Sequence, residues 1–247
     1  MTEHRRDGPP IEKNTAAAPS PADSRGVGRF EEVLLQKSRD SRLGKRMRTR
    51  FLFLTIVAQC IQIDSAKDPT LEDVLERSGL ARSTFYTNFK DVAECVTEVL
   101  TLFFESLGES RGITERELSS YQAILEANTW YCRSYEANAG LFAGVARNPT
   151  VLKMREAQNA SWARKIVHVS ERRRGVPFTQ AIRKEYTGIV GILIVMTTEA
   201  ARERFVTKDK LLVSTYRTAD ALAESLTGIW YRMTIGYEQS QTLTRRS

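Results

Sequence analysis

The chain has few of the residues that build metal centres and disulfide frameworks. Among 247 residues there are three cysteines (Cys60, Cys95 and Cys132) without CxxC spacing, and two histidines, His4 and His168. An odd number of scattered cysteines is typical of a reducing compartment and not of a disulfide framework or a zinc cluster. Since His4 lies in an expected tail, a zinc hydrolase or a Ser-His-Asp triad would depend on His168 alone. We therefore expect no metal and no cofactor.

Long apolar stretches are also missing. The two longest uncharged stretches, 51–63 and 186–198, have 13 residues each, whereas a membrane-spanning helix needs about 18–20. The first 20 residues contain no apolar run of the kind found in a secretory signal. We expect a cytoplasmic protein with no membrane partner.

Strand patterns and glycine-rich nucleotide-binding motifs are absent too. No segment alternates convincingly between apolar and polar residues, and there is no GxGxxG or Walker-type motif. After residue 28 there are only three prolines, each where a helix would begin. With 41% hydrophobic residues the chain can bury a core. The sequence predicts an all-α fold.

The formal charge of +7 is unevenly distributed. Residues 1–28 balance four basic against four acidic side chains and contain four prolines, a composition that predicts a flexible tail. Residues 29–50 carry eight basic against three acidic side chains. The dense cationic stretch 37–50 directly precedes the apolar segment 51–63. This position favours phosphate contact over a solvated tether.

Within this region we distinguish a basic arm, 29–45, in which Phe30, Val33 and Leu34 could form one extra amphipathic helix. Arg46 and Arg48 follow the arm and are the residues that we expect to contact phosphates.

The segment 70–92 contains the most specific pattern in the chain. Thr70 can cap a helix with apolar positions at Leu71, Val74 and Leu75, and Ser78-Gly79 supplies a residue able to adopt positive φ and end that helix. A second short helix is expected from about Arg82 to Thr87.

Two short helices joined by a tight turn form a helix-turn-helix unit, whose second helix fits the major groove of DNA. The pattern turns Val74, Leu80, Phe85 and Phe89 inward. The side chains expected on the outward face form hydrogen bonds and have little apolar content: Arg82, Ser83, Thr84, Tyr86, Thr87 and Asn88.

With its Gly79-Leu80, Thr84-Phe85-Tyr86 and Phe89-Lys90, this segment resembles the DNA-binding signature of TetR-family transcriptional regulators. The resemblance covers about residues 46–100; the rest is similar only in being helical and of suitable length. It implies a homodimeric repressor with a three-helix domain, 46–92, on double-stranded operator DNA. It further implies a helical domain, 93–240, that dimerises and binds a small-molecule effector, followed by a tail, 241–247.

By this resemblance Arg82 and Ser83 lie at positions where the family contacts bases, and Thr84, Tyr86 and Lys90 lie at positions where it contacts phosphates. Arginine can bond guanine O6 and N7 at once, and hydroxyl groups can donate to phosphate oxygens. Ala81 departs from the family, which commonly has a hydroxyl residue at that N-cap. The full predicted DNA-binding set is Arg46, Arg48, Thr70, Arg82, Ser83, Thr84, Tyr86, Thr87, Asn88 and Lys90.

Two segments near the end of the chain, 179–206 and 209–235, each have apolar residues at alternating steps of four and three, which predicts two long helices. Their apolar stripes are wider than one neighbouring helix could cover. We expect these helices to pair with a second copy in a four-helix bundle, giving a homodimer. The alternative is that both are buried within one subunit.

Aromatic residues concentrate between the predicted DNA-binding and dimerisation regions. They could line an apolar effector cavity with a few polar anchors, or simply pack in the core. The candidate effector-binding residues are Asn128, Trp130, Tyr131, Tyr135, Phe142, Asn159, Trp162 and His168.

The function expected from the sequence is thus a sequence-specific transcriptional regulator, a repressor that its effector releases from DNA, and not an enzyme. One alternative is an all-α enzyme with an incidental helix-turn-helix, whose weak acid-base candidates are Glu185 and Glu199 with His168. Another is a DNA-binding activator without an effector.

Overall fold

The computed structural model describes residues 28–110 and 120–244. The expected N-terminal tail therefore lies almost entirely outside the described residues. The described part is all-α, without a strand, as the sequence predicts. The helices of its first half are α1 (Phe30–Arg39), α2 (Lys45–Ile63), α3 (Leu71–Ser78), α4 (Arg82–Asn88) and α5 (Val92–Ser110). Those of its second half are α6 (Ser120–Ala137), α7 (Ala139–Arg147), α8 (Pro149–Arg174), α9 (Gln180–Arg202), α10 (Lys210–Thr215) and α11 (Ala219–Thr244).

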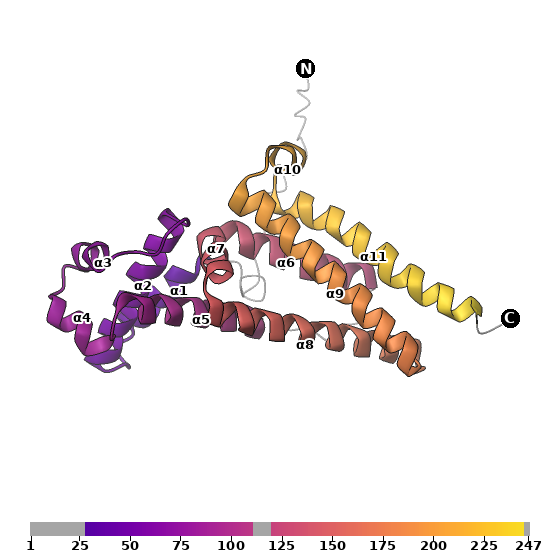
Figure 1. Ribbon diagram of the computed structural model, residues 1–247, viewed down its shortest axis with the longest axis horizontal. Helices are drawn as coiled ribbons and strands as arrows, with labels where there is room; N and C mark the ends of the chain where they lie inside the picture. The colour runs from indigo at the N-terminus through magenta and orange to yellow at the C-terminus, as the bar shows by residue number, and fades with distance from the viewer. Residues whose placement is uncertain (1–27, 111–119, 245–247) are drawn as a thin grey trace, which may run out of the picture.

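The short helices α3 and α4 lie at one end of the molecule, and the long helices α8, α9 and α11 extend towards the other (Figure 1). Helix α2 lies between them and contacts α1, α3, α4, α5 and α7. Its residues Phe53, Leu54, Val57 and Ile61 are completely or almost completely buried. A helix surrounded in this way is apolar on most of its faces, which explains the long uncharged stretch that begins at Phe51.

Two hydrophobic clusters form the interior. The larger one surrounds α2 and includes side chains of α1, α5, α6, α7 and the start of α11. The second lies among α8, α9 and α11 and includes Val167, Phe178, Tyr186 and Trp230. The apolar residues that recur along 179–206 therefore largely pack α9 against helices of its own chain.

The basic arm does contain a helix. In α1, Phe30 and Leu34 are buried, and the ring of Phe30 lies 5.4 Å from that of Phe103 in α5. The N-terminus of α1 is tied to the junction of α6 and α7, where Asn138 accepts a hydrogen bond from the Phe30 amide (2.8 Å) and donates one to the Gly28 carbonyl (3.1 Å).

The single helix predicted over 209–235 is wrong. The chain forms a π-helical turn at Glu203–Thr207, then α10, and breaks at residues 216–218 before α11 begins. Arg204 stabilises the break by donating hydrogen bonds to the carbonyls of Tyr216 (2.6 Å) and Arg217 (3.1 Å). The Thr218 hydroxyl accepts a hydrogen bond from the Ala221 amide at the start of α11. The stripe from Leu212 to Met233 is thus divided between two helices. Helix α11 also continues past residue 240, to Thr244.

The end of α2 is fixed to the start of α7 by close backbone packing. The Gln62 side chain accepts from the amides of Gly140 (2.8 Å) and Leu141 (3.2 Å) and donates to the Ala137 carbonyl (3.0 Å). A Cβ atom at Gly140 would lie 2.5 Å from the Ile61 carbonyl oxygen and 2.6 Å from the Gln62 Cα. Only glycine allows this approach.

We expect Gly140→Ala to lower the free energy of unfolding by about 1–3 kcal/mol, since the added methyl meets backbone that cannot move aside easily. Chemical denaturation would measure it. Gly44→Ala is the control: Gly44 precedes α2 at φ −59°, with nothing within 4 Å of an added Cβ, so the substitution should cost less than about 1 kcal/mol. Equal stability of the two variants would show that the α2–α7 contact is looser in solution.

Candidate nucleic-acid interface

Helix α4 is held against the protein by two phenylalanines. Phe85 and Phe89 are buried, and their rings lie 5.3 Å and 6.4 Å from that of Phe53 in α2, both edge-on. The inward direction predicted for these two residues is confirmed. Their packing fixes which face of α4 points outward.

Two arginines of α2 fix the C-terminal end of α4. The Arg50 guanidinium lies 4.1 Å from the centre of the Phe89 ring, donates to the Asn88 carbonyl and forms an ion pair with Glu98 of α5. Arg46 donates to the Thr87 carbonyl (3.2 Å). These contacts satisfy carbonyls that the end of a helix leaves without partners.

Helix α3 begins and ends as the sequence predicts. The Thr70 hydroxyl accepts from the Asp73 amide (3.2 Å) while the Asp73 carboxylate accepts from the Thr70 amide (2.8 Å), a reciprocal cap. The hydrogen bonds from Thr70 lower the pKa of Asp73. Gly79 ends the helix at φ 64°. Ala81 occupies the N-cap position of α4 and provides no side-chain cap.

The outward face of α4 contains most of the predicted side chains. Tyr86 is 52% exposed although the neighbouring Phe85 is buried, and Thr84 is half-buried. The exposed residues along α4 and just after it are Arg82, Ser83, Tyr86, Thr87 and Lys90. Thr70 is exposed at the start of α3, Arg46 is exposed beside α4, and Arg48 is half-buried. The face thus presents one guanidinium, one ammonium and several hydroxyl groups to the solvent.

Asn88 does not belong to this face. Asn88 is only 8% exposed, and its side chain donates to the Thr84 carbonyl within α4 (2.8 Å). Asn88 is the last residue of α4, and its side chain bonds to the preceding turn of the helix instead of facing the solvent. The predicted outward position of Asn88 is wrong.

An ion pair that the sequence pattern did not predict joins α3 to α4. Arg82 Nη2 lies 2.7 Å from Glu72 Oε1, and both side chains are more than half exposed. The hydrogen bond to its own backbone amide and the one from Arg82 lower the pKa of Glu72. The residue expected to read bases is therefore already bound to a carboxylate.

The candidate effector-binding residues fall into two groups. Tyr131, Tyr135 and Phe142 pack together between α6 and α7. The rings of Tyr135 and Phe142 are stacked at 3.6 Å, and those of Tyr131 and Tyr135 meet edge-on at 5.4 Å. Trp130 packs against the same cluster. Asn128 is buried and donates to the Thr227 hydroxyl (3.1 Å). Burial raises the pKa of Tyr135 well above its ordinary value, so its hydroxyl stays protonated.

The other three candidates lie on α8. Trp162 packs against the second hydrophobic cluster, Asn159 is half-buried, and His168 is exposed. The structure therefore does not bring the eight candidates together around one site.

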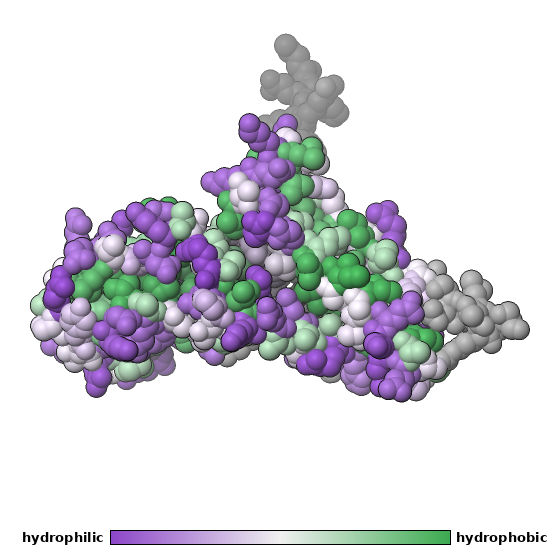
Figure 2. Space-filling model, in the orientation of Figure 1, coloured by the Kyte–Doolittle hydropathy of each residue, from purple (hydrophilic) through white to green (hydrophobic). Residues whose placement is uncertain are grey.

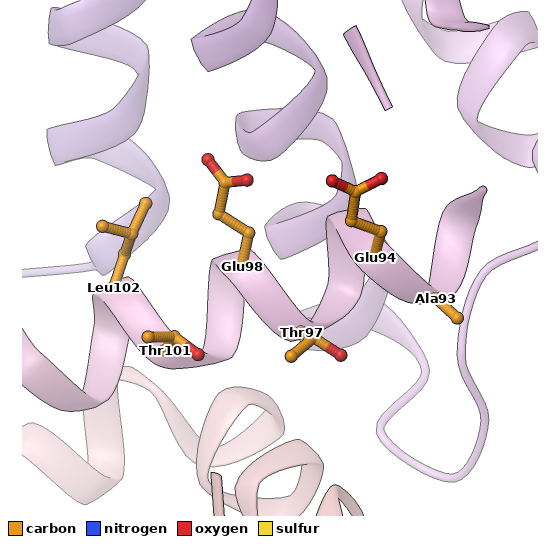
Figure 3. Close-up of a pocket in the computed structure, with 6 residues that line it drawn as sticks. All are labelled: Ala93, Glu94, Thr97, Glu98, Thr101 and Leu102. Carbon is orange, nitrogen blue, oxygen red and sulfur yellow. The ribbon is translucent and has the colours of Figure 1, made fainter. Parts of the chain in front are cut away.

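Among the described residues, shallow pockets lie along α5 and at the start of α11, and none of the candidate effector residues lines either of these two. The first, about 450 Å³, follows one face of α5, where Glu94, Thr97, Glu98 and Thr101 lie along the helix (Figure 3). Its carboxylates are already engaged, because Glu94 accepts from the Lys90 amide (2.6 Å) and Glu98 pairs with Arg50. The second, about 420 Å³, lies beside the Arg133–Asp220 ion pair.

The acid-base candidates of the enzyme alternative do not form a pair. Glu185 accepts from the Tyr237 hydroxyl (2.8 Å) and Glu199 pairs with Arg202. Fourteen residues separate them along α9, which corresponds to about 21 Å. Within residues 28–110 and 120–244 no cluster of three His, Cys, Asp or Glu side chains could hold a metal ion. No helix in the same ranges is long and apolar enough to cross a membrane.

No family model matches the chain, and neither the curated proteins nor the solved structures contain a match.

We expect Arg82→Ala to raise the pKa of Glu72 part of the way to its ordinary value, because the ion pair is lost while the backbone hydrogen bond stays. Carboxyl carbon shifts followed by NMR across a pH series would measure it. Ser83→Ala, which leaves both partners in place, should not change it. A Glu72 pKa that is the same with and without Arg82 would show that the pair does not form in solution.

Proposed function

We propose that the protein is a sequence-specific DNA-binding transcriptional regulator of the TetR type, with α3 and α4 as its helix-turn-helix and α4 as the recognition helix. The observation that carries the proposal is the division of α4 into two faces. Phe85 and Phe89 anchor one face on α2, and Arg82, Ser83, Tyr86 and Thr87 are presented on the other. An exposed helix of this size fits the major groove.

In this proposal Arg82 and Ser83 contact base edges, and Thr84, Tyr86 and Lys90 bind phosphates. Arg46 and Thr70 lie at the margins of the same end of the molecule and add phosphate contacts, Arg46 beside the last turn of α4 and Thr70 at the start of α3. Phosphate contacts fix the position of a protein on DNA, whereas base contacts provide its sequence preference.

The protein is proposed to act as a homodimer through α9 and α11. Although both helices are packed within the chain, apolar side chains remain exposed on them, with Ile192 70% and Val195 64% exposed on α9 and Met233 48% on α11. Figure 2 shows apolar surface over these helices. A twofold dimer would present two copies of α4 to a near-palindromic operator.

The effector is proposed to act on the contact between α6 and α7, where Tyr135 stacks on Phe142. A ligand that separates these rings moves α7, and α7 is bound to the end of α2 through Gln62. Helix α2 in turn packs against α4 through Phe53. The ligand shifts DNA binding only by its difference in affinity between the two arrangements. In the repressor that we propose, it favours the arrangement that releases DNA.

The proposal is tested by fluorescence anisotropy with DNA from upstream of the protein's own gene beside scrambled DNA, across a salt series. Arg82→Ala should weaken binding to the first by about 1–3 kcal/mol and leave binding to scrambled DNA nearly unchanged. Lys90→Ala is the phosphate-contact control and should weaken both equally, lowering the salt slope by about 1. Equal binding of the wild-type protein to both DNAs would refute sequence-specific regulation.

Ile192→Asp should convert the dimer to a monomer, because a charge would replace an apolar side chain at the proposed interface. Sedimentation equilibrium would measure the mass, with Val176→Asp as the control. Val176 is also an exposed apolar residue, 47% exposed, but it precedes α9. A wild-type protein that sediments as a monomer, or an Ile192→Asp dimer, would rule out this interface.

A further inference from the structure

One arginine lies on the inward face of α8. Arg155 is half-buried, and it lies on the same helical line as Val151, Trp162 and Ile166. Val151 is completely buried, and Trp162 and Ile166 pack against the second hydrophobic cluster. A guanidinium at such a position costs free energy unless an anion or several hydrogen-bond acceptors accompany it.

Among the described residues, no carboxylate forms an ion pair with Arg155. Glu199 of α9 lies within reach of its charge, but the Glu199 carboxylate is bound to Arg202 at 2.5 Å and is 55% exposed. The hydrogen bond from Arg202 lowers the pKa of Glu199, and the charge of Arg155 adds to this effect. Helices α8 and α9 diverge from the turn that joins them (Figure 1). Arg155 therefore faces a carboxylate that already has a partner.

The stretch of α8 around Arg155 lies between the two hydrophobic clusters. Met154 packs against the first cluster and Trp162 against the second, and both are half-buried. Gln158 lies one turn after Arg155, and its Oε1 atom is buried without a hydrogen-bond partner in the described part of the chain. This part of α8 thus combines apolar side chains with a charge and an acceptor that are left unsatisfied.

The hydroxyl of Tyr135 lies near the same guanidinium. Burial raises the pKa of Tyr135 well above its ordinary value, and the charge of Arg155 opposes this rise. The hydroxyl is hydrogen-bonded to that of Tyr131, which in turn lies 3.1 Å from the Thr198 hydroxyl of α9. Because Tyr135 stays protonated, it can donate its proton to an anion that takes the place of Tyr131.

A carboxylate satisfies these groups together. It accepts hydrogen bonds from a guanidinium and from a phenol, and such charge-assisted bonds are stronger than those between neutral groups. An apolar body attached to it finds Met154 and Trp162 on either side of Arg155, and since all three are half-buried they can be reached from the solvent. A neutral ligand would leave Arg155 without a counter-charge.

We propose that the effector is a small organic acid, whose carboxylate binds Arg155 beside the Tyr135 hydroxyl and whose apolar part packs against Met154 and Trp162. The inference rests on the proposed function and names the chemical class of its effector. It also connects binding with the response. A carboxylate that draws the Tyr135 hydroxyl towards α8 displaces the ring that stacks on Phe142 at 3.6 Å, the contact on which the effector is proposed to act.

The test uses benzoate and octanoate as probes, at constant ionic strength. NMR would follow the Nε–H resonance of Arg155 during the titration, and both acids should shift it and raise the midpoint of thermal unfolding. Benzamide lacks the charge and inorganic phosphate lacks an apolar body. Each should bind at least about tenfold more weakly than benzoate.

Arg155→Met removes the charge and keeps an unbranched apolar side chain. It should weaken benzoate binding by about 10- to 100-fold, the factor for one lost hydrogen bond to a charged group. Without ligand its midpoint of thermal unfolding should stay the same or rise, because an unpaired charge is removed. Arg164→Met is the matched control: it removes the same charge from an exposed position of α8 and should bind benzoate as the wild type does.

Three results would overturn the inference. Neither acid shifts the Arg155 resonance, or Arg155→Met binds benzoate as tightly as Arg164→Met, or Arg155→Met unfolds at a markedly lower temperature, which would show that Arg155 pairs with a carboxylate of the protein. In each case a wild-type preference for the operator would leave the proposed function standing.

The anisotropy assay with operator DNA tests the regulatory part. Benzoate should lower the operator affinity of the wild type and of Arg164→Met but not that of Arg155→Met. An acid that binds at Arg155 without changing operator affinity would refute its role as the effector class. If the acids bind through Arg155 and the wild type shows no preference for the operator, the proposed function fails and only the site for organic acids remains.

Discussion

A helix of seven residues is not stable in water by itself, because too few hydrogen bonds form to offset the cost of nucleation. Helix α4 has this length, so its existence and its orientation depend on the packing of Phe85 and Phe89 against Phe53. The carbonyls at its end are held by Arg46 and Arg50, which also come from α2. The outward face of α4 is therefore set by α2 more than by α4 itself. Every proposal made for Arg82 and its neighbours depends on this arrangement.

The same α2 helix is fixed at its other end to the second half of the chain. Gln62 binds the first amides of α7, and Gly140 lets the two backbones meet. Nearby, Asn138 binds the start of α1, the helix that packs along α2. A short corner, residues 137–141, thus holds both α1 and α2. Because the Tyr135–Phe142 stack brackets this corner, a displacement of these rings acts directly on the helix that carries α4. In the proposed effector response, a small displacement of these rings is therefore passed through residues 137–141 and α2 to α4, without a large rearrangement.

The parts of the structure that could be predicted from the sequence are those determined by near neighbours. The cap at Thr70, the turn at Gly79 and the inward direction of Phe85 and Phe89 follow from patterns within a few residues. The break at residues 216–218 could not be predicted, because it is stabilised by Arg204 from an earlier turn. Asn88 was misplaced for a similar reason, since the end of α4 and the neighbouring helices determine its environment. For the aromatic residues the sequence left two alternatives, a cavity lining and core packing, because a sequence does not distinguish rings that line a space from rings that fill it.

The charge on the surface of α4 also affects the proposed DNA binding, which combines nonspecific electrostatic attraction with recognition of particular bases. Much of the cationic charge near this end of the chain lies in residues 37–50, from the end of α1 to the start of α2, and not on α4 itself. The outward face of α4 has one arginine, already paired with Glu72, and otherwise mainly hydroxyl groups. Charge attracts any DNA, whereas hydrogen bonds from a fixed helix depend on which bases they meet. A face with little net charge contributes little to nonspecific binding. Its contribution to the binding free energy must therefore come from hydrogen bonds to the bases that it fits. The pairing of Arg82 with Glu72 lowers the net charge of the face further, while the guanidinium remains present for contacts with bases.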